Sequence, residues 1–148
     1  MRLSGALDAA ALERALGEVV RRHESLRTTF ADSDGGPVQV IAPADGFALP
    51  VEDLSPLAEP EREDELLRRV GDEAARPFDL ETGPLFRAPL LRLGGEDHVL
   101  LLCMHHVVTD GWSMGVLFRE MSELYSAFSQ GAPSPLPELP VQYADYAV

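Results

Sequence analysis

Residues 98–106, HVLLLCMHH, form an apolar run that ends in two adjacent histidines. A strand with one face in water alternates apolar and polar residues, whereas a strand buried on both faces is apolar throughout. The run is therefore predicted to be a central strand. Residues 84–93, PLFRAPLLRL, precede it, and GGED between the two segments is typical of a β-hairpin. Such a sheet must be covered, so we expect helices to pack on it.

Three other segments have the periodicity of amphipathic helices. The first begins at Asp8, a candidate N-cap, and ends near His23. The second lies within residues 55–76 and is stopped by Pro77, and the third spans residues 112–130. The residues expected to be buried are Leu12, Leu16, Val19 and Val20 in the first helix, Leu66, Leu67, Val70 and Ala74 in the second, and Met114, Leu117, Phe118, Met121, Leu124, Tyr125 and Phe128 in the third.

Short strands are also expected over residues 26–30 and 37–42, on either side of the turn DSDGG. Strands and helices thus interleave, but the hairpin is antiparallel. The sequence predicts the α/β class, as a two-layer sandwich of helices on a mixed, largely antiparallel sheet.

Length and charge limit the possible partners. The chain has 148 residues, enough for one ordinary core, and a net charge of −13. This balance disfavours nucleic acid or an anionic membrane as a partner, because both attract clustered positive charge. No segment resembles a signal peptide or a membrane span, and the single cysteine, Cys103, is compatible with a cytoplasmic location. Prolines over residues 131–142 predict an extended connector.

The two histidines alone fit more than one kind of site. Neighbours on a strand point to opposite faces, so one ring should enter the core while the other faces a cavity. Zinc requires three or four converging ligands, and a serine hydrolase would need a G-x-S-x-G turn, which is absent. A general base or a positioning histidine remains. Asp110 could approach an imidazole or cap the next helix, and Gly111 suits a sharp exit from the strand.

Three segments together resemble the condensation domains of non-ribosomal peptide synthetases. They are RHESLRTTF at residues 22–30, MHHVVTDGWS at 104–113 and YADYAV at 143–148, in the order typical of that family. The stretch at 76–93 is similar to the one that precedes the family's histidine motif, HHxxxDG. The resemblance implies a chloramphenicol-acetyltransferase-like fold, in which two lobes form a V around a tunnel. Residues 1–148 would be the N-terminal, histidine-bearing lobe, with the second lobe absent and the fragment inactive alone.

The resemblance also implies an activity and its partners. Upstream donor and downstream acceptor carrier domains would deliver thioesters on phosphopantetheine arms, and the acceptor amine would attack the donor thioester to form an amide. The lobe itself would bind no cofactor and no metal. An adenylation domain would belong to the same synthetase, and the product would be an antibiotic or another secondary metabolite.

Four residues of the histidine motif acquire expected roles from this resemblance. His106 would face the tunnel and act as a base or position the attacking amine. The amide of Gly111 would help to hold the developing oxyanion. His105 would be structural, and Ser113 would contribute to the substrate tunnel.

The remaining site residues are expected to be structural. Asp110 would form an ion pair with Arg22 or Arg27, both in the 22–30 segment. Trp112 is expected to pack in the core at the start of the third helix. Two alternatives stay open: a related acyltransferase or epimerisation domain of the same superfamily, and a catalytically silent module that docks a carrier domain or another partner.

Overall fold

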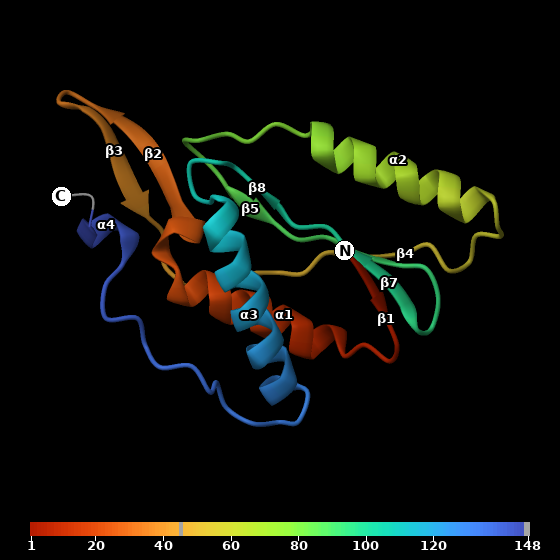
Figure 1. Ribbon diagram of the computed structural model, residues 1–148. Helices are drawn as coiled ribbons and strands as arrows, with labels where there is room; N and C mark the ends of the chain where they lie inside the picture. The colour runs from red at the N-terminus through yellow and green to blue at the C-terminus, as the bar shows by residue number, and fades with distance from the viewer. Residues whose placement is uncertain (45, 147–148) are drawn as a thin grey trace. The chain divides into compact units, whose positions relative to one another are not determined.

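The computed structural model describes residues 1–44 and 46–146 (Figure 1). Its elements, in chain order, are β1 (Arg2–Ser4), α1 (Ala9–Arg22), the 3-10 helix η1 (Glu24–Arg27), β2 (Thr28–Ser33), β3 (Gly36–Ile41), β4 (Val51–Asp53), α2 (Glu61–Ala75), β5 (Phe86–Arg87), β6 (Leu90–Arg92), β7 (Asp97–Leu100), β8 (Cys103–Met104), α3 (Gly111–Phe128) and α4 (Tyr143–Tyr146).

The chain divides into two compact units. One, the sheet unit, comprises Met1–Leu7, Leu49–Pro77 and Phe86–Cys103. The other, the helix unit, comprises Asp8–Ala48, Phe78–Leu85 and the described residues from Met104 onward. No helix in residues 1–44 and 46–146 combines the length and the apolarity needed to cross a bilayer.

The sheet unit contains a four-stranded sheet in the order β1-β7-β6-β4. β7 pairs antiparallel with both β1 and β6, whereas β4 and β6 are parallel, so the sheet is mixed. Leu66 of α2 joins a buried cluster with Leu54, Leu91 and Leu93. The predicted arrangement of a helix on a mixed sheet is therefore present in this unit. Leu67, expected on the buried face of α2, is instead 62% exposed.

The predicted β-hairpin is confirmed at β6 and β7, where Arg92 lies opposite His98. Each predicted arm is nevertheless broken into two strands, because β5 and β8 pair separately from the larger sheet. Pro89 lies at the break in the first arm and has no N–H to donate. Its carbonyl accepts a hydrogen bond from Leu101 N at 2.9 Å, at the break in the second arm. β7, between β1 and β6, is the central strand that the apolar run predicts.

In the helix unit, α1 packs against α3, as Figure 1 shows. Asp8 caps α1 by accepting a hydrogen bond from Ala11 N at 2.9 Å, which confirms the predicted start of this helix. The buried side chains of the two helices include Leu12, Leu16 and Val19 of α1 and Leu117, Met121 and Leu124 of α3. Phe118 is a correction, since it is 36% exposed at the edge of the apolar face.

Candidate functional site

The two histidines follow β8 rather than end it, because the strand stops at Met104. His105 is fixed by backbone hydrogen bonds: its N–H donates to Leu85 O at 3.0 Å, and its carbonyl accepts from Val108 N at 3.0 Å. Its Nδ1 accepts from Val107 N at 3.1 Å, and its ring lies edge-on to Phe78 with centroids 5.9 Å apart. These contacts leave Nδ1 of His105 engaged as an acceptor.

His106 lies differently. It is exposed, and its ring has no hydrogen-bond partner within the described part of the chain. Because β8 ends at Met104, both histidines lie in the turn after the strand. This turn, and not the alternation of side chains along a strand, gives His105 and His106 their different environments. Within the described residues, both ring nitrogens of His106 are therefore available for hydrogen bonds with a ligand.

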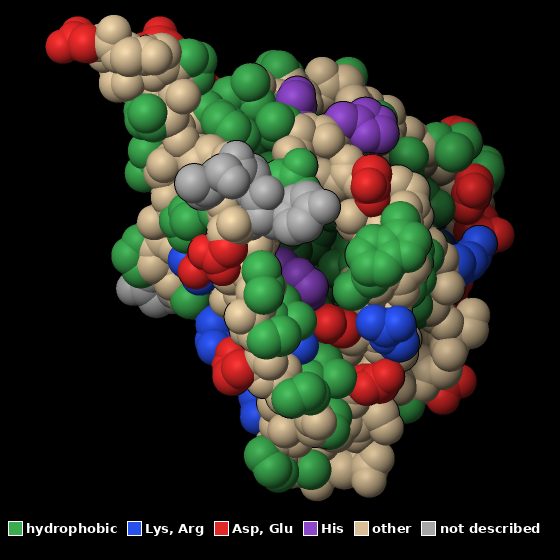
Figure 2. Space-filling model, turned by 60° about the vertical axis from the view of Figure 1, so that its left-hand side comes forward, with side chains coloured by type: hydrophobic (Ala, Val, Ile, Leu, Met, Phe, Trp, Pro, Cys, Tyr) green, Lys and Arg blue, Asp and Glu red, His purple; other side chains and the backbone are tan. Residues whose placement is uncertain are grey.

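A hollow of about 550 Å³, here called the His106 pocket, lies in the helix unit. The turn and α3 contribute His106, Asp110, Trp112, Ser113, Val116 and Arg119, and the C-terminal segment contributes Leu139, Val141, Gln142 and Tyr143. His23 and Glu120 also line the pocket. Figure 2 shows this hollowed face, with hydrophobic and histidine side chains around it. Such a mixture of apolar walls and a few polar groups is typical of a small-molecule site.

A smaller hollow of about 100 Å³ shares several lining residues with the His106 pocket, namely His23, Ser25, Val108, Thr109, Trp112, Ser113 and Val116. The residues that line the smaller hollow alone are apolar: Val19, Leu26, Met104 and Leu117. The apolar lining therefore continues from the His106 pocket between the 3-10 helix and the start of α3.

Asp110 is the N-cap of α3, and no arginine pairs with it in the part of the chain that the structure describes. Its Oδ1 accepts hydrogen bonds from Ser113 N at 2.8 Å and from Ser113 Oγ at 2.6 Å. The Ser113 hydroxyl, followed by the Ser113 amide, holds the pKa of Asp110 below its ordinary value. The capping alternative left open by the sequence is the one observed.

The expected ion pair of Asp110 with Arg22 or Arg27 is not formed within residues 1–44 and 46–146. The physical reason is that both arginines are engaged elsewhere while Asp110 is exposed. Arg22 pairs with Glu120, and Arg27 contacts Glu24 at 3.3 Å and donates to the carbonyl of Ala42.

Gly111 is the first residue of α3, and its φ lies outside the left-handed region. A Cβ added there would meet no atom within 4 Å. The backbone of the turn therefore does not require glycine, contrary to the expectation of a sharp exit from the strand. What remains is space: the missing side chain leaves room for a ligand beside the first residue of α3.

Trp112 is also a correction. It was expected in the core, yet it is 80% exposed and lines the His106 pocket. The buried residues of α3, which packs on α1, begin at Leu117. Trp112 lies in the first turn of α3, before these residues, and therefore stays outside the core. An exposed indole at a pocket is available to contact a ligand or another chain.

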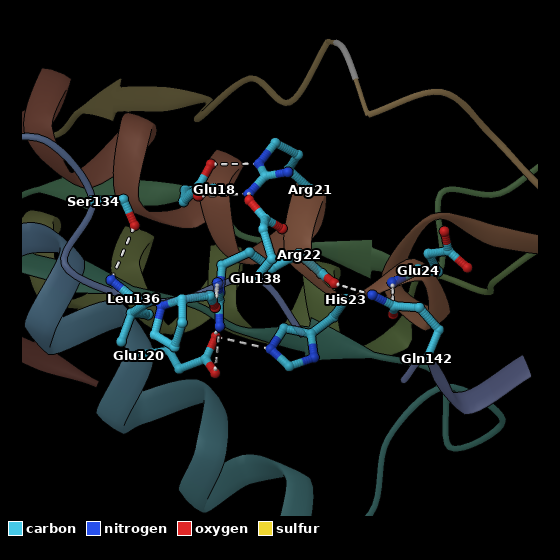
Figure 3. A network of polar contacts seen from close by, with 11 residues as sticks. Glu18, Arg21, Arg22, His23, Glu24, Glu120, Ser134, Leu136, Glu138 and Gln142 are labelled. Carbon is cyan, nitrogen blue, oxygen red and sulfur yellow. Dashed lines mark hydrogen bonds and ion pairs between the residues drawn. The ribbon is translucent and has the colours of Figure 1, made fainter. Parts of the chain in front are cut away.

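A buried charge network joins α1 to α3 beneath the pocket (Figure 3). Glu120 of α3 lies 3.1 Å from Arg22 Nε and 2.9 Å from His23 Nε2, with both Glu120 and Arg22 almost fully buried. Burial opposes ionisation of Glu120, but the hydrogen bonds from Arg22 and His23 outweigh it, so the pKa of Glu120 lies below its ordinary value. Glu120 therefore stays an anion and neutralises the buried Arg22.

The same network fixes the C-terminal segment. Arg22 Nη1 donates to Pro137 O at 2.6 Å, and Arg21 contacts Glu138 at 2.6 Å. Gln142 donates through Nε2 to Arg22 O at 2.9 Å and accepts from Glu24 N at 3.2 Å. Residues 132–142, which contain no helix or strand, are thereby held against α1, and Leu139, Val141 and Gln142 of this segment form one wall of the pocket.

Sequence reasoning did not include His23, Glu120 and the segment 139–143 among the site residues. A signal was present for Glu120, because it stands beside Met121 between Leu117 and Leu124 on the apolar face of α3. A charged residue within an apolar face indicates a buried partner. Tyr143 is the first residue of the YADYAV segment, but nothing in the sequence of residues 139–142 indicates that they line a pocket.

Residues able to hold a metal do not converge in the described residues, where no three of the His, Cys, Asp and Glu side chains form a possible ion site. Cys103 is partly buried, and desolvation is the main cause that raises the pKa of its thiol. Its thiol is therefore poorly suited to act as a thiolate ligand or nucleophile.

Comparison with known proteins identifies the family of this chain. A family model described as "Condensation domain" matches residues 1–148. The chain belongs to the condensation-domain family, as the three sequence segments predicted.

Its relatives are non-ribosomal peptide synthetases. The chain is 57% identical over 145 residues to chondramide synthase cmdD of Chondromyces crocatus, covering 98% of this chain and 4% of the relative. It is 45% identical over 148 residues to cyclosporin synthetase simA of Tolypocladium inflatum, covering 99% of this chain and 1% of the relative. The chain thus spans a small part of each synthetase.

Solved structures agree on the fold. The X-domain from teicoplanin biosynthesis superposes with a TM-score of 0.87 at 36% identity, covering 99% of this chain and 31% of that structure. The starter condensation domain of rhizomide synthetase RzmA gives a TM-score of 0.82 at 26% identity, covering 98% and 34%. The α/β class predicted from the sequence is confirmed.

Proposed function

We propose that this chain contributes the histidine-bearing half of an amide-forming site in non-ribosomal peptide synthesis. An acceptor amine on one carrier domain attacks the carbonyl carbon of a donor thioester on another. The C–N bond forms, the C–S bond breaks, and the thiol of the donor arm leaves. The observation that carries this proposal is the ring of His106, which has no hydrogen-bond partner among the described residues and lies in a pocket that the start of α3 also lines.

His106 is proposed to orient the attacking amine and to accept its proton. A neutral imidazole suits this task because it can accept through one nitrogen and donate through the other near neutral pH. A thioester is already activated, so holding the amine close to the carbonyl supplies a large part of the rate. His105, held by Leu85 and Val107, would fix the turn that presents His106.

Gly111 is proposed to serve the oxyanion. Asp110 caps Ser113 N, whereas the N–H of Gly111, the first residue of α3, lies at the positive end of the helix dipole. A side chain at residue 111 would occupy the open space beside this N–H. Glycine would then let the thioester carbonyl come close enough for its oxygen to accept a hydrogen bond as negative charge develops.

In our proposal, amide formation also requires parts of the synthetase other than this chain. A second lobe would complete a tunnel, donor and acceptor carrier domains would insert their phosphopantetheine arms, and an adenylation domain would load an amino acid. The phosphopantetheine belongs to the carrier domains, and the lobe itself holds no cofactor. The cytoplasmic location expected from the sequence remains a prediction.

A second candidate is a silent docking module. It is favoured by the similarity to the X-domain from teicoplanin biosynthesis, since a related structure of that domain is a complex with OxyB. The position of His106 in a pocket, with no partner for its ring among the described residues, favours the catalytic function instead.

The experiment is amide formation by the complete two-lobed domain with loaded donor and acceptor carriers, compared with its His106→Ala variant. Turnover that depends on His106 supports catalysis. An inactive parental domain that still binds a partner would favour the docking module.

A further inference from the structure

The arginines of this chain are almost all neutralised by carboxylates. Among the described residues, the arginines with a carboxylate partner are Arg2, Arg21, Arg22, Arg27, Arg62, Arg68, Arg69, Arg76, Arg87 and Arg92. Arg14 lies over the ring of Phe128 at 4.4 Å. Arg119 has neither kind of partner in the described part of the chain, although it is exposed. It is therefore a cation free to bind an anion from outside.

Other arginine clusters do not offer such a site. Arg68 lies 2.5 Å from Glu65 and 2.6 Å from Asp72, and Arg69 lies 2.5 Å from Glu52. An anion approaching them would have to displace these carboxylates. Because the net charge is −13, an anion is repelled by most of the surface and held only where a cation is unpaired.

Arg119 lies at one end of a continuous track on α3. Trp112, Val116 and Arg119 are spaced so that they share one helix face, and all three line the His106 pocket. The helical rise places Cα of Arg119 about 12 Å from that of Gly111. The track thus runs from the turn that carries His106, over the apolar Trp112 and Val116, to a guanidinium.

We propose that Arg119 binds the phosphate of an incoming phosphopantetheine arm. This inference rests on the proposed function, because that function brings such an arm to His106. The arm has the same order of groups as the track: a sulfur at one end, an apolar dimethyl group near the other, and then a phosphate. The thioester lies at His106, the dimethyl group packs on Trp112 and Val116, and the guanidinium donates two hydrogen bonds to the phosphate oxygens.

The test measures binding of two free probes, phosphopantetheine and pantetheine, to the complete two-lobed domain. The two probes differ only in the phosphate. We expect the parental domain to bind phosphopantetheine about tenfold more tightly, as one charge-assisted contact allows. Arg119→Gln abolishes this preference, and Arg119→Lys keeps part of it. Arg76→Gln, which removes an exposed arginine outside the pocket, preserves it in full.

Two outcomes would overturn the inference: the parental domain shows no preference for the phosphorylated probe, or Arg119→Gln retains the preference. If Arg119→Gln retains the preference but weakens binding of a holo carrier domain, Arg119 is assigned instead to a carboxylate of the carrier. A preference that depends on Arg119 in a domain without amide-forming turnover would contradict the proposed function and leave this inference standing.

Discussion

The carboxylate of Glu120 lies 3.1 Å from Arg22 Nε, in an ion pair whose side chains are 6% and 2% exposed. This pair links the middle of α3 to the last residue of α1. Since Arg22 also holds Pro137, the pair connects the two packed helices with the segment that forms one wall of the His106 pocket.

Breaking this pair should strongly destabilise the fold. Glu120→Gln leaves the Arg22 charge buried without its counterion, and we expect a loss of about 3 kcal/mol in the free energy of unfolding. Urea denaturation measures it. Arg68→Gln, which removes an exposed ion pair with Glu65, is the matched control and should change stability little. Equal effects of the two variants would contradict the role given to Glu120.

The double variant Arg22→Met with Glu120→Leu removes both charges together. Because apolar residues can replace a buried pair at little cost, we expect it to be more stable than Glu120→Gln. The wall of the pocket would still lose the Arg22 contact to Pro137. Substrate binding in the double variant should therefore be weaker than in the parental domain although the fold is recovered, which separates the two functions of Arg22.

The contribution of Glu120 should depend on pH. Its pKa is lowered in the folded state, because hydrogen bonds from Arg22 and His23 outweigh the burial that would raise it. Stability from such a carboxylate is complete above its unfolded pKa of about 4.3 and is lost as pH falls through the folded pKa. The stability difference between the parental chain and Glu120→Gln should therefore shrink on acidification. A difference constant between about pH 6 and pH 3 would contradict this assignment.

The cap of α3 offers a separate test. Asp110→Ala removes the acceptor for Ser113 N and Oγ, and we expect the melting temperature to fall by a few degrees. Asp110→Asn keeps a capping oxygen and should be close to the parental chain. If Asn were as damaging as Ala, the negative charge of Asp110 would matter beyond capping, as in the ion pair that the family resemblance implies.

Trp112 is the single tryptophan of the chain and 80% exposed, so its fluorescence reports on the pocket. We expect strong quenching by acrylamide in the chain of residues 1–148, and weaker quenching once a ligand or a second lobe covers the indole. Trp112→Ala should barely change the melting temperature. Phe118, also exposed on α3 but outside the His106 pocket, provides the matched control in the two-lobed domain: Phe118→Ala should not affect substrate binding, whereas Trp112→Ala should weaken it.

Local chemistry explains what could be predicted from the sequence. The side chain of Asp8, the apolar face of α1 and the GGED turn each act on neighbouring residues, and all three form as expected. The burial of Phe118 was predicted wrongly because periodicity gives the centre of a helix face more reliably than its edges. Pairing over long distances is different. Arg22 and Glu120 are 98 residues apart, and nothing local indicates which carboxylate the arginine selects.

In the site, too, local features could be predicted from the sequence, whereas contacts between distant segments could not. The motif placed His106, Asp110 and Gly111 together, and the pocket brings His106 and Asp110 to one hollow. The expected core position of Trp112 was wrong, because apolar character does not reveal whether a residue at the start of a helix faces its own chain or a ligand. The wall formed by residues 139–143 depends on contacts with α1 that only the folded chain reveals.

The central claim is that His106 acts in amide formation. Its most direct measurement is single-turnover product formation by the complete two-lobed domain, with donor and acceptor loaded on their carriers. We expect His106→Ala to lower the rate about 100-fold or more while the melting temperature stays unchanged, because the ring has no partner in the described residues. An undiminished rate in a correctly folded His106→Ala domain would contradict the account.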